Sequence, residues 1–189
     1  MRKLPCPTSP AWLIVPALIA PAVAVSPAYA VQYMTTEGAQ KQLFPEASSF
    51  VAHPLNLTDA QQDRVEKAAK VRMRYPEQPV WQVLAGGKPA GWFVLDEVYG
   101  KHEFITYAVA LDAAGAVRGV EILDYRETHG GEIRHPKWRA QFNGARYGAA
   151  LKLGDDIQNI SGATLSCKHI SEGVRRVLAI HEVALKQPR

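Results

Sequence analysis

Hydrophobic and polar residues alternate with the spacing of β-strands through the middle of the chain. Four such runs follow one another, at residues 80–86, 91–99, 103–112 and 116–125 (VWQVLAG, GWFVLDEVY, EFITYAVALD and AVRGVEILDY). Short glycine-containing segments separate them, as in β-hairpins. Four strands joined by short turns favour an antiparallel meander with one face against a hydrophobic core.

Helical patterns stand on both sides of this meander. Thr58-Asp59-Ala60-Gln61 fits a capping box, and residues 59–73 behind it have the spacing of an amphipathic helix. Residues 166–186 predict a second helix, whose apolar face contains Val174, Val177, Leu178 and Leu185. The predicted fold class is therefore α+β, an antiparallel β-meander flanked by an N-terminal helix and a C-terminal helix.

The segment between the last predicted strand and the last helix has no sustained period. Its first part, YRETHGGEIRHPKWRAQFNG (residues 125–144), is interpreted as a functional loop followed by a short helix around Trp138. Trp138 is expected in the core, with stacking against a bound ring system as the alternative.

Residues 1–30 have the layout of a secretory signal peptide. Two basic residues precede the apolar run AWLIVPALIAPAVAV, and Ala28-Tyr29-Ala30 forms a small-x-small cleavage site. A membrane-spanning helix needs about 20 apolar residues, and this run is shorter and contains prolines. We therefore expect cleavage before Val31 and a periplasmic product, with an uncleaved membrane anchor as the alternative.

The expected mature chain has two parts, an N-terminal extension with a helix at residues 31–79 and a ligand-binding domain at residues 80–189. Loss of residues 1–30 removes two basic residues and no acidic ones, so 20 Lys and Arg stand against 18 Asp and Glu. A net charge of about +2 with scattered basic residues does not predict nucleic-acid binding.

Cysteine and histidine usage narrows the chemistry further. Cys6 leaves with the signal peptide, so Cys167 stands alone and no intramolecular disulfide is possible. The sequence contains no Cys-x-x-Cys-His motif for c-type haem, and its six histidines lack zinc-ligand spacing. No metal site is predicted.

Ser161-Gly162-Ala163-Thr164 lies just before the N-terminus of the last predicted helix. In one interpretation Ser161 is simply the helix N-cap and Gly162 eases the turn. In the other, the free backbone N–H groups and the helix dipole hold a phosphate. Gly162 would then allow close approach of the backbone, and the hydroxyls of Ser161, Thr164 and Ser166 would donate to the phosphate oxygens.

This tetrapeptide, followed by Leu165-Ser166, resembles the attachment motif of the periplasmic FMN-binding domain. That domain occurs in the flavin subunits of sodium-pumping quinone reductases and of ion-translocating ferredoxin oxidoreductases. In the family, a flavin transferase joins the FMN phosphate to the last threonine of the motif through a phosphoester, and that threonine corresponds to Thr164. The family has an aspartate three residues before the motif serine, where this chain has Gln158.

A second family signature is a Glu-Thr-Pro-Gly loop that lies against the isoalloxazine ring. Glu127-Thr128-His129-Gly130 is similar to it, with His129 in place of the proline. The resemblance spans residues 80–185 and makes residues 80–189 an expected FMN-binding domain. The cofactor-binding residues that it implies are Thr164, Ser161, Gly162, Ala163, Leu165, Ser166, Glu127, Thr128, His129 and Gly130.

The resemblance implies an extracytoplasmic electron carrier with one FMN, matured by a flavin transferase and working with a membrane-bound redox partner. No catalytic residue is predicted. A flavin-dependent reductase with its own small substrate is one alternative. A non-redox binding domain, in which Ser-Gly-Ala-Thr is only a helix start, is the other.

Overall fold

The structure, a computed structural model, describes residues 33–186. The predicted signal peptide, including Cys6 and the cleavage site before Val31, lies outside these residues. In the part of the chain that the structure describes, no helix is both long enough and apolar enough to cross a membrane.

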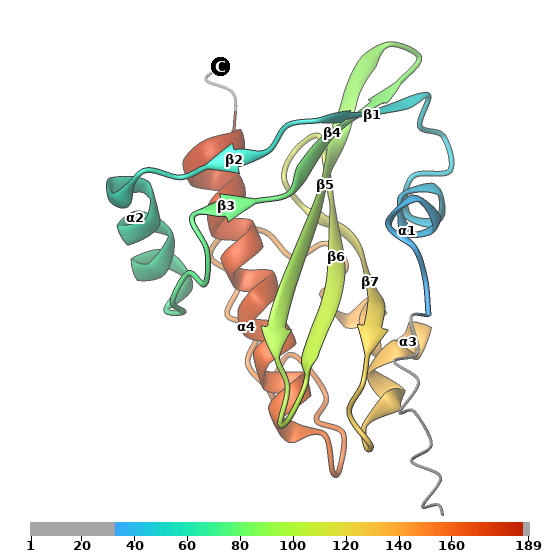
Figure 1. The fold of residues 1–189 in the computed structure, drawn as a ribbon, viewed down its shortest axis with the longest axis vertical. Helices are drawn as coiled ribbons and strands as arrows, with labels where there is room; N and C mark the ends of the chain where they lie inside the picture. The colour runs from blue at the N-terminus through green and yellow to red at the C-terminus, as the bar shows by residue number, and fades with distance from the viewer. Residues whose placement is uncertain (1–32, 187–189) are drawn as a thin grey trace, which may run out of the picture.

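A five-stranded antiparallel sheet forms the centre of the fold (Figure 1), and its strand order is β1-β4-β5-β6-β7. The predicted meander supplies four of these strands, β4 (Val80–Ala85), β5 (Lys88–Tyr99), β6 (Phe104–Asp112) and β7 (Val117–Tyr125). The fifth, β1 (Ser49–Ala52), comes from the predicted N-terminal extension and pairs with β4 at the edge. A small second sheet joins β2 (Leu55–Asn56) to β3 (Glu77–Gln78).

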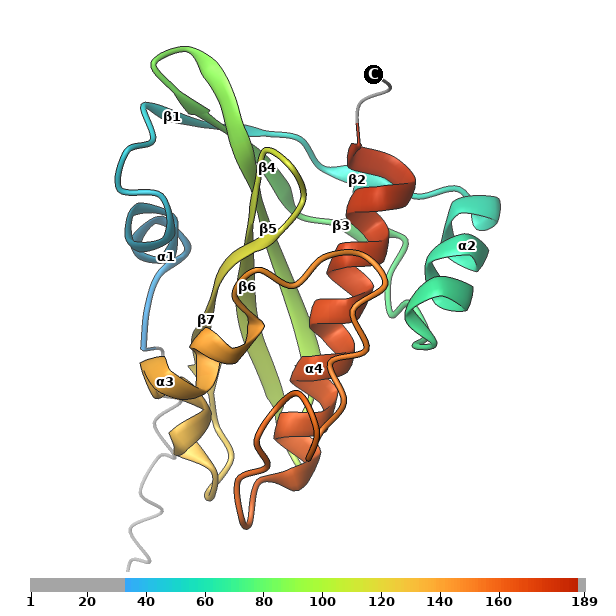
Figure 2. The same ribbon diagram turned by 180° about the vertical axis from the view of Figure 1, so that it is seen from behind.

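The longest helix, α4 (Thr164–Ile180), lies along one face of the sheet and continues into a π-helical turn, His181–Leu185. Figure 2 shows α4 beside the strands and α2 (Asp59–Ala69) on its outer side. The predicted capping box is present at the start of α2, where Thr58 and Gln61 cap each other's backbone. These features confirm the predicted α+β fold, although α2 ends four residues earlier than the pattern suggested.

The opposite face of the sheet is also covered, by α1 (Thr36–Leu43). A second hydrophobic cluster forms there, which joins Phe44 to Val83, Phe93, Ala108, Ala110 and Leu123. The expectation that only one face would be buried was therefore wrong. Strand β6 is buried on both faces: Ala108 and Ala110 pack in the second cluster, whereas Tyr107 and Val109 pack in the core on the α4 side. This explains why the sequence of β6 is almost continuously apolar.

An ion pair fixes α4 against the sheet. Arg176 on α4 donates through Nη2 to Asp96 Oδ2 on β5 at 2.6 Å, and both side chains are almost completely buried. The hydroxyl of Tyr107 donates to the same oxygen at 2.5 Å. Burial and the nearby Asp96 carboxylate raise the pKa of Tyr107, so its hydroxyl keeps the donated proton. Gly173 leaves the space that this hydroxyl occupies.

Three further short elements follow β7: a 3-10 turn (Gly131–Arg134), α3 (Pro136–Arg139) and another 3-10 turn (Ala140–Phe142). They contain the predicted short helix around Trp138. The Trp138 side chain is buried, and its indole Nε1 donates to the carbonyl oxygen of Gln158 at 2.8 Å. Trp138 is thus a core residue that holds the segment leading to α4.

The buried ion pair predicts a large difference between two arginine substitutions. Arg176→Met leaves Asp96 buried without its charge partner and should lower the free energy of unfolding by about 3–5 kcal/mol. Arg118→Met removes an exposed partner of Glu46 and should cost less than about 1 kcal/mol. Urea denaturation of both variants measures the difference, and equal small losses would contradict the anchoring role of Arg176.

Candidate functional site

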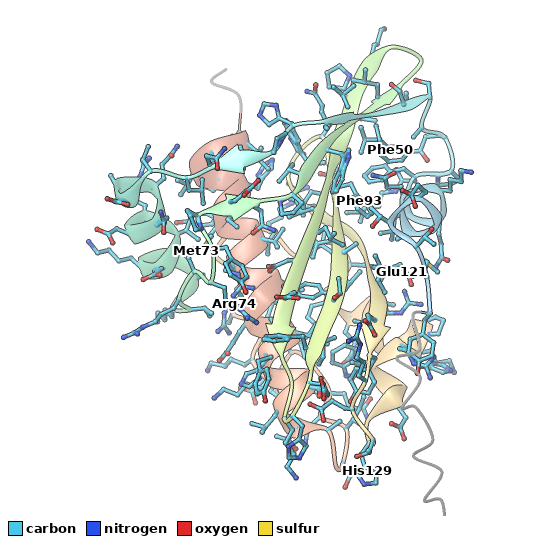
Figure 3. All side chains as sticks on the ribbon, in the orientation of Figure 1. Phe50, Met73, Arg74, Phe93, Glu121 and His129 are labelled. Carbon is cyan, nitrogen blue, oxygen red and sulfur yellow. The ribbon has the colours of Figure 1, made fainter. Side chains whose placement is uncertain are left out.

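The two sequence motifs meet at one end of the molecule. A cavity of about 260 Å³ lies between the end of β7 and the start of α4. It is lined by Lys101, His102, Glu127, Thr128, His129, Gly162, Ala163, Thr164, Leu165 and Ser166. Figure 3 shows His129 at this end, far from Phe50 and Phe93 in the second hydrophobic cluster. Segments more than 30 residues apart in the sequence therefore share one binding space.

The start of α4 is an open helix N-terminus. Ala163 is the N-cap residue, and no side chain caps the helix there. Since the first N–H groups of a helix have no partner within the helix, those at the start of α4 are available to a ligand. The interpretation of Ser161 as the N-cap is wrong. Ser161 and Gly162 instead form the preceding turn, where Gly162 has a φ of +81°.

Accessibility differs among the residues of this first turn. The side chains of Thr164 and Leu165 are exposed, whereas Ser166 and Cys167 are buried. The Thr164 hydroxyl is thus reachable from solvent at the positive end of the helix dipole, where a phosphate is stabilised. Burial raises the pKa of the Cys167 thiol, which leaves Cys167 as a protonated core residue.

Glu127 organises the opposite wall of the cavity. One of its carboxylate oxygens accepts hydrogen bonds from the backbone N–H groups of Lys101, His102 and Glu103, the last two at 2.6 and 3.1 Å. Partial burial acts to raise the pKa of Glu127, but these hydrogen bonds outweigh it and lower the pKa. Glu127 therefore remains an anion that holds the β5–β6 turn, including Lys101 and His102, beside the cavity.

Tyr125 and Gly130 join the loop after β7 to the start of α4. The buried hydroxyl of Tyr125 donates to the carbonyl oxygen of His129 and lies 3.4 Å from Ser166 Oγ. Gly130 has a φ of +87°, and a Cβ built on it would overlap Ala163 and lie 2.7 Å from the Tyr125 hydroxyl. Only glycine allows this close packing of the two motifs.

Two of the predicted residues do not line this cavity. Ser161 is exposed in the turn before α4, and Gly130 lies beneath the cavity against Ala163. Two basic residues on α4 follow the attachment motif, and their environments differ. Lys168 is exposed, whereas His169 Nδ1 lies 2.5 Å from the carbonyl oxygen of Tyr99. His169 therefore ties α4 to the end of β5.

Sequence reasoning missed three residues of the site: Lys101, His102 and Tyr125. The sequence pattern identifies the first two only as turn residues, and Tyr125 only as the end of a strand. Lys101 and His102 reach the site because the Glu127 carboxylate binds their turn, and Tyr125 because its hydroxyl binds the His129 backbone. No local sequence pattern specifies these contacts. Lys101 and His102 add basic groups to the cavity, and one oxygen of its single lining carboxylate, Glu127, already accepts three backbone N–H groups. Together with the open start of α4, these basic groups suit an anion.

A second, more open hollow of about 710 Å³ adjoins this cavity and shares Thr128 and His129 with it. Its other lining residues are Gly130, Gly131, Glu132, Arg134, His135 and Pro136. A cavity of 260 Å³ is below the roughly 300–1,000 Å³ of typical cofactor sites. A ligand with a phosphate at α4 and a ring system would fit by extending from the cavity along the 127–130 loop.

Among residues 33–186, no group of three metal-ligating side chains comes together.

Comparisons with known proteins show what this chain is similar to. Residues 100–179 match the family described as the FMN-binding domain. The chain is 25% identical over 161 residues to a protein of Acetobacterium woodii that is one of the subunits of the Na(+)-translocating ferredoxin:NAD(+) oxidoreductase complex. This match covers 78% of this chain and 74% of that protein.

Two crystal structures are also similar. One of them, from the Na(+)-translocating NADH-quinone reductase of Parabacteroides distasonis, has a TM-score of 0.53 at 19% identity, covering 82% of this chain and 86% of that one. NqrC of Shewanella oneidensis has a TM-score of 0.47 at 20% identity, covering 74% and 80%. The predicted family resemblance is confirmed by the domain match and by the relative from Acetobacterium woodii, and FMN is the cofactor that this family binds.

Replacement of Gly130 tests the contact between the two motifs. In protein expressed without a flavin transferase and mixed with free FMN, Gly130→Ala should reduce the FMN bound per protein, because the new methyl group pushes the 127–130 loop away from Ala163. Gly144→Ala is the matched control: Gly144 also has a positive φ, +79°, but nothing lies within 4 Å of its added Cβ. Visible absorbance relative to protein measures retention, and equal losses in both variants would contradict the steric account.

Proposed function

Because residues 100–179 match the FMN-binding domain family, we propose that this chain is a periplasmic electron carrier with FMN attached to Thr164 through a phosphoester. The observation that carries the proposal is the cavity itself. It brings Glu127, Thr128 and His129 together with the residues from Gly162 to Ser166, and it leaves the Thr164 hydroxyl exposed.

The phosphate would be held at the start of α4. The open N–H groups of the first turn and the helix dipole favour an anionic group there. From the opposite wall, Lys101 adds positive charge and His102 adds a ring that can form a hydrogen bond. Thr164 is the first residue of the helix, and its side chain caps nothing. A phosphoester on its hydroxyl therefore leaves the backbone of α4 undisturbed.

The ring system would lie along the 127–130 loop. His129 is exposed and belongs to both the cavity and the adjoining hollow, so it stands where an edge of the ring would pass. The Tyr125 hydroxyl fixes the His129 backbone from beneath. FMN supplies one-electron and two-electron redox chemistry, whereas the protein sets its orientation and its exposure to solvent.

Covalent attachment has a physical advantage outside the cytoplasm. A reversibly bound cofactor would be lost by diffusion after export, whereas a tether retains it at any affinity. Gln158, at the position of the family's aspartate, has an exposed side chain and a backbone held on both sides, its carbonyl by Trp138 and its N–H by Gln141. A flavin transferase can therefore reach both Gln158 and Thr164 on a fixed segment.

The electron partner is proposed to be a membrane-bound redox protein. The similar protein from Acetobacterium woodii and the similar structure from Parabacteroides distasonis are both named as parts of Na(+)-translocating complexes. A carrier role also suits the exposed position of the cavity at one end of the molecule, because electrons can be exchanged there without a second substrate site.

Substitution of Thr164 tests the attachment. When it is co-expressed with a flavin transferase, the parent protein should gain the mass of one FMN less one water and fluoresce on a denaturing gel. Thr164→Ala should do neither, whereas the control Ser161→Ala should behave as the parent, because Ser161 does not line the cavity. A fluorescent Thr164→Ala band would move the attachment elsewhere. An unmodified parent would contradict a covalent link and leave a non-covalent flavin site.

Export is tested separately. Amino-terminal sequencing of the protein recovered from the periplasm should begin at Val31, one residue after Ala28-Tyr29-Ala30. Recovery of the full-length chain alone, in the membrane fraction, would show that residues 1–30 act as an uncleaved anchor.

A further inference from the structure

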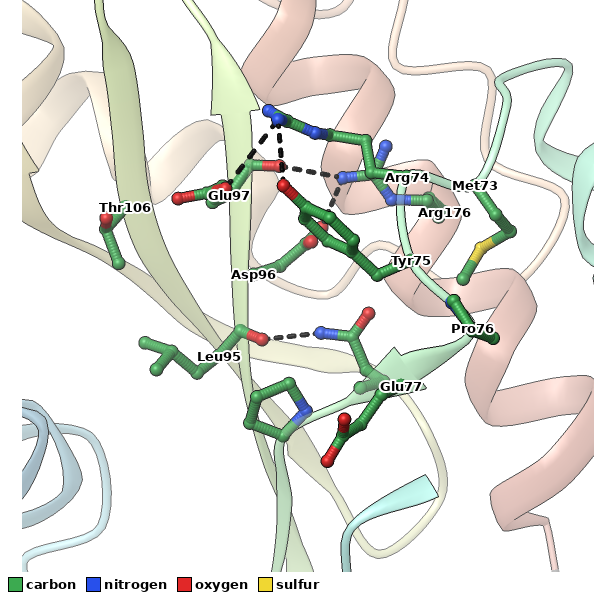
Figure 4. Close-up of a pocket in the computed structure, with 12 residues that line it drawn as sticks. Met73, Arg74, Tyr75, Pro76, Glu77, Leu95, Asp96, Glu97, Thr106 and Arg176 are labelled. Carbon is green, nitrogen blue, oxygen red and sulfur yellow. Dashed lines mark hydrogen bonds and ion pairs between the residues drawn. The ribbon is translucent and has the colours of Figure 1, made fainter. Parts of the chain in front are cut away.

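Another cavity lies beside β5, away from the candidate site, and shares no lining residue with the cavity between the two motifs. Its volume is about 440 Å³, within the range of small-ligand sites. Figure 4 shows the residues around it, which come from the segment between α2 and β4, from β5 and β6, and from α4. None of the proposed flavin-binding residues belongs to it.

The topology of the sheet creates this cavity. β4 pairs with β5 only as far as Val94, so the outer edge of β5 is free of strand pairing from Leu95 onward. The segment before β4 covers that edge. Gln78 Nε2 donates to the Leu95 carbonyl oxygen at 2.5 Å, and the Leu95 N–H donates to the Pro79 carbonyl oxygen at 3.1 Å. The walls are mainly apolar and include Met73, Tyr75, Pro76, Pro79 and Leu95.

An unused carboxylate oxygen lies in this apolar surrounding. The Asp96 side chain lines the cavity and is only 10% exposed. Arg176 and Tyr107 both donate to its Oδ2 atom. Within residues 33–186, no group donates to Asp96 Oδ1. Asp96 Oδ1 is not among the fully buried side-chain atoms of residues 33–186 that lack a partner, so it is open to the cavity. A ligand in the cavity can therefore donate a hydrogen bond to it.

A second carboxylate stands near the mouth of the cavity. The Glu97 side chain is 34% exposed, and its nearest cation, Arg74 Nη2, lies at 3.8 Å, beyond hydrogen-bonding distance. Arg74 is held instead over the ring of Phe104, at 4.2 Å from its centroid. Glu97 therefore keeps its capacity to accept a hydrogen bond.

The charges that line the cavity favour a cation. Three carboxylates, those of Glu77, Asp96 and Glu97, face two guanidinium groups, those of Arg74 and Arg176. Arg176 is already committed, because it donates to Asp96 and to the Glu97 carbonyl oxygen. Arg74 donates to the Tyr75 hydroxyl and lies over the ring of Phe104. The carboxylate oxygens are thus the charged acceptors left to a ligand, beside walls that are mainly apolar.

We propose that this cavity binds an ammonium or guanidinium group carried on a short apolar stem, with the cation between Asp96 Oδ1 and the Glu97 carboxylate and the stem along Tyr75, Pro76 and Leu95. This chemistry has two possible sources, a free amine or a basic side chain of a protein partner. The site goes beyond the flavin chemistry and does not depend on it.

The position of the cavity gives the second source a functional consequence. Phe104, beneath Arg74, packs edge-on against Tyr99 at 5.1 Å, and these two residues flank the turn that carries Lys101 and His102. A partner whose basic side chain entered the cavity would lie next to the turn that lines the flavin site. The cavity would then position a partner for electron exchange.

Calorimetric titration of the secreted protein with pentylamine tests the proposal, with 1-pentanol as the uncharged probe of equal length. Pentylamine should bind and pentanol should not. Glu97→Gln should weaken the binding of pentylamine about tenfold, as expected for loss of a charged hydrogen-bond acceptor. Glu37→Gln, at an exposed carboxylate in the first turn of α1, is the control and should leave binding unchanged.

Arg74→Gln gives a result of opposite sign. It removes the cation that competes for Glu97 and should tighten pentylamine binding about threefold, the scale of an exposed ion pair. Asp96→Asn is unsuitable because it leaves Arg176 buried without its partner. Thr106→Phe, which fills the cavity from β6 with a residue that strands favour, should abolish binding while the flavin content stays at the parent level.

A blocked lysine, Nα-acetyl-lysine methylamide, separates the two sources. Tighter binding than pentylamine indicates a protein side chain as the occupant, and weaker binding indicates a free amine. Equal binding of pentylamine and pentanol, no binding by the parent protein, or an unchanged affinity in Glu97→Gln would each overturn the proposal. Flavin content measured in the same samples distinguishes these results from a failure of the flavin site.

Discussion

The contact between Gly130 and Ala163 is the constraint on which the candidate site depends. It brings the loop after β7 onto the first turn of α4, and it is possible only because residue 130 has no side chain and adopts a positive φ. The Tyr125 hydroxyl, which donates to His129 and lies near Ser166, holds both segments from beneath. Without this contact, the 127–130 loop and the start of α4 would not line one cavity. The proposed phosphate site would then not adjoin the loop along which the flavin ring is proposed to lie.

The contact requires α4 to lie in a fixed position along the sheet. Arg176 pairs with Asp96 in the second half of the helix, and His169 meets the Tyr99 carbonyl oxygen near its start. Glu127 then ties the β5–β6 turn to the same end of the molecule. The buried polar contacts of the core thus determine where the open N-terminus of α4 points, which links the stability of the fold to the geometry of the candidate site.

The four strands of the meander, both flanking helices and the family resemblance could be predicted from the sequence, because alternation, the Thr58–Gln61 capping box and the two motifs are local patterns. The short strands β1, β2 and β3 were not predicted. The burial of both sheet faces could not, since it depends on α1 packing against Phe93 and Ala108 from a distant part of the chain. Lys101 and His102 were missed for the same reason. Their place in the site follows from the reach of the Glu127 carboxylate across 25 or more residues, which no spacing rule encodes.

Hydrogen–deuterium exchange on the flavin-loaded and flavin-free protein tests most directly whether the two motifs bind one cofactor together. Binding of FMN across both segments should slow exchange in three places: the turn at residues 100–103, the loop at 127–130 and the start of α4 at 161–166. The segment at residues 73–79, which lines the other cavity, should exchange equally in both forms. Protection confined to residues 161–166 would contradict the account, because it would mean that the flavin is held at the helix start alone and its ring is free in solvent.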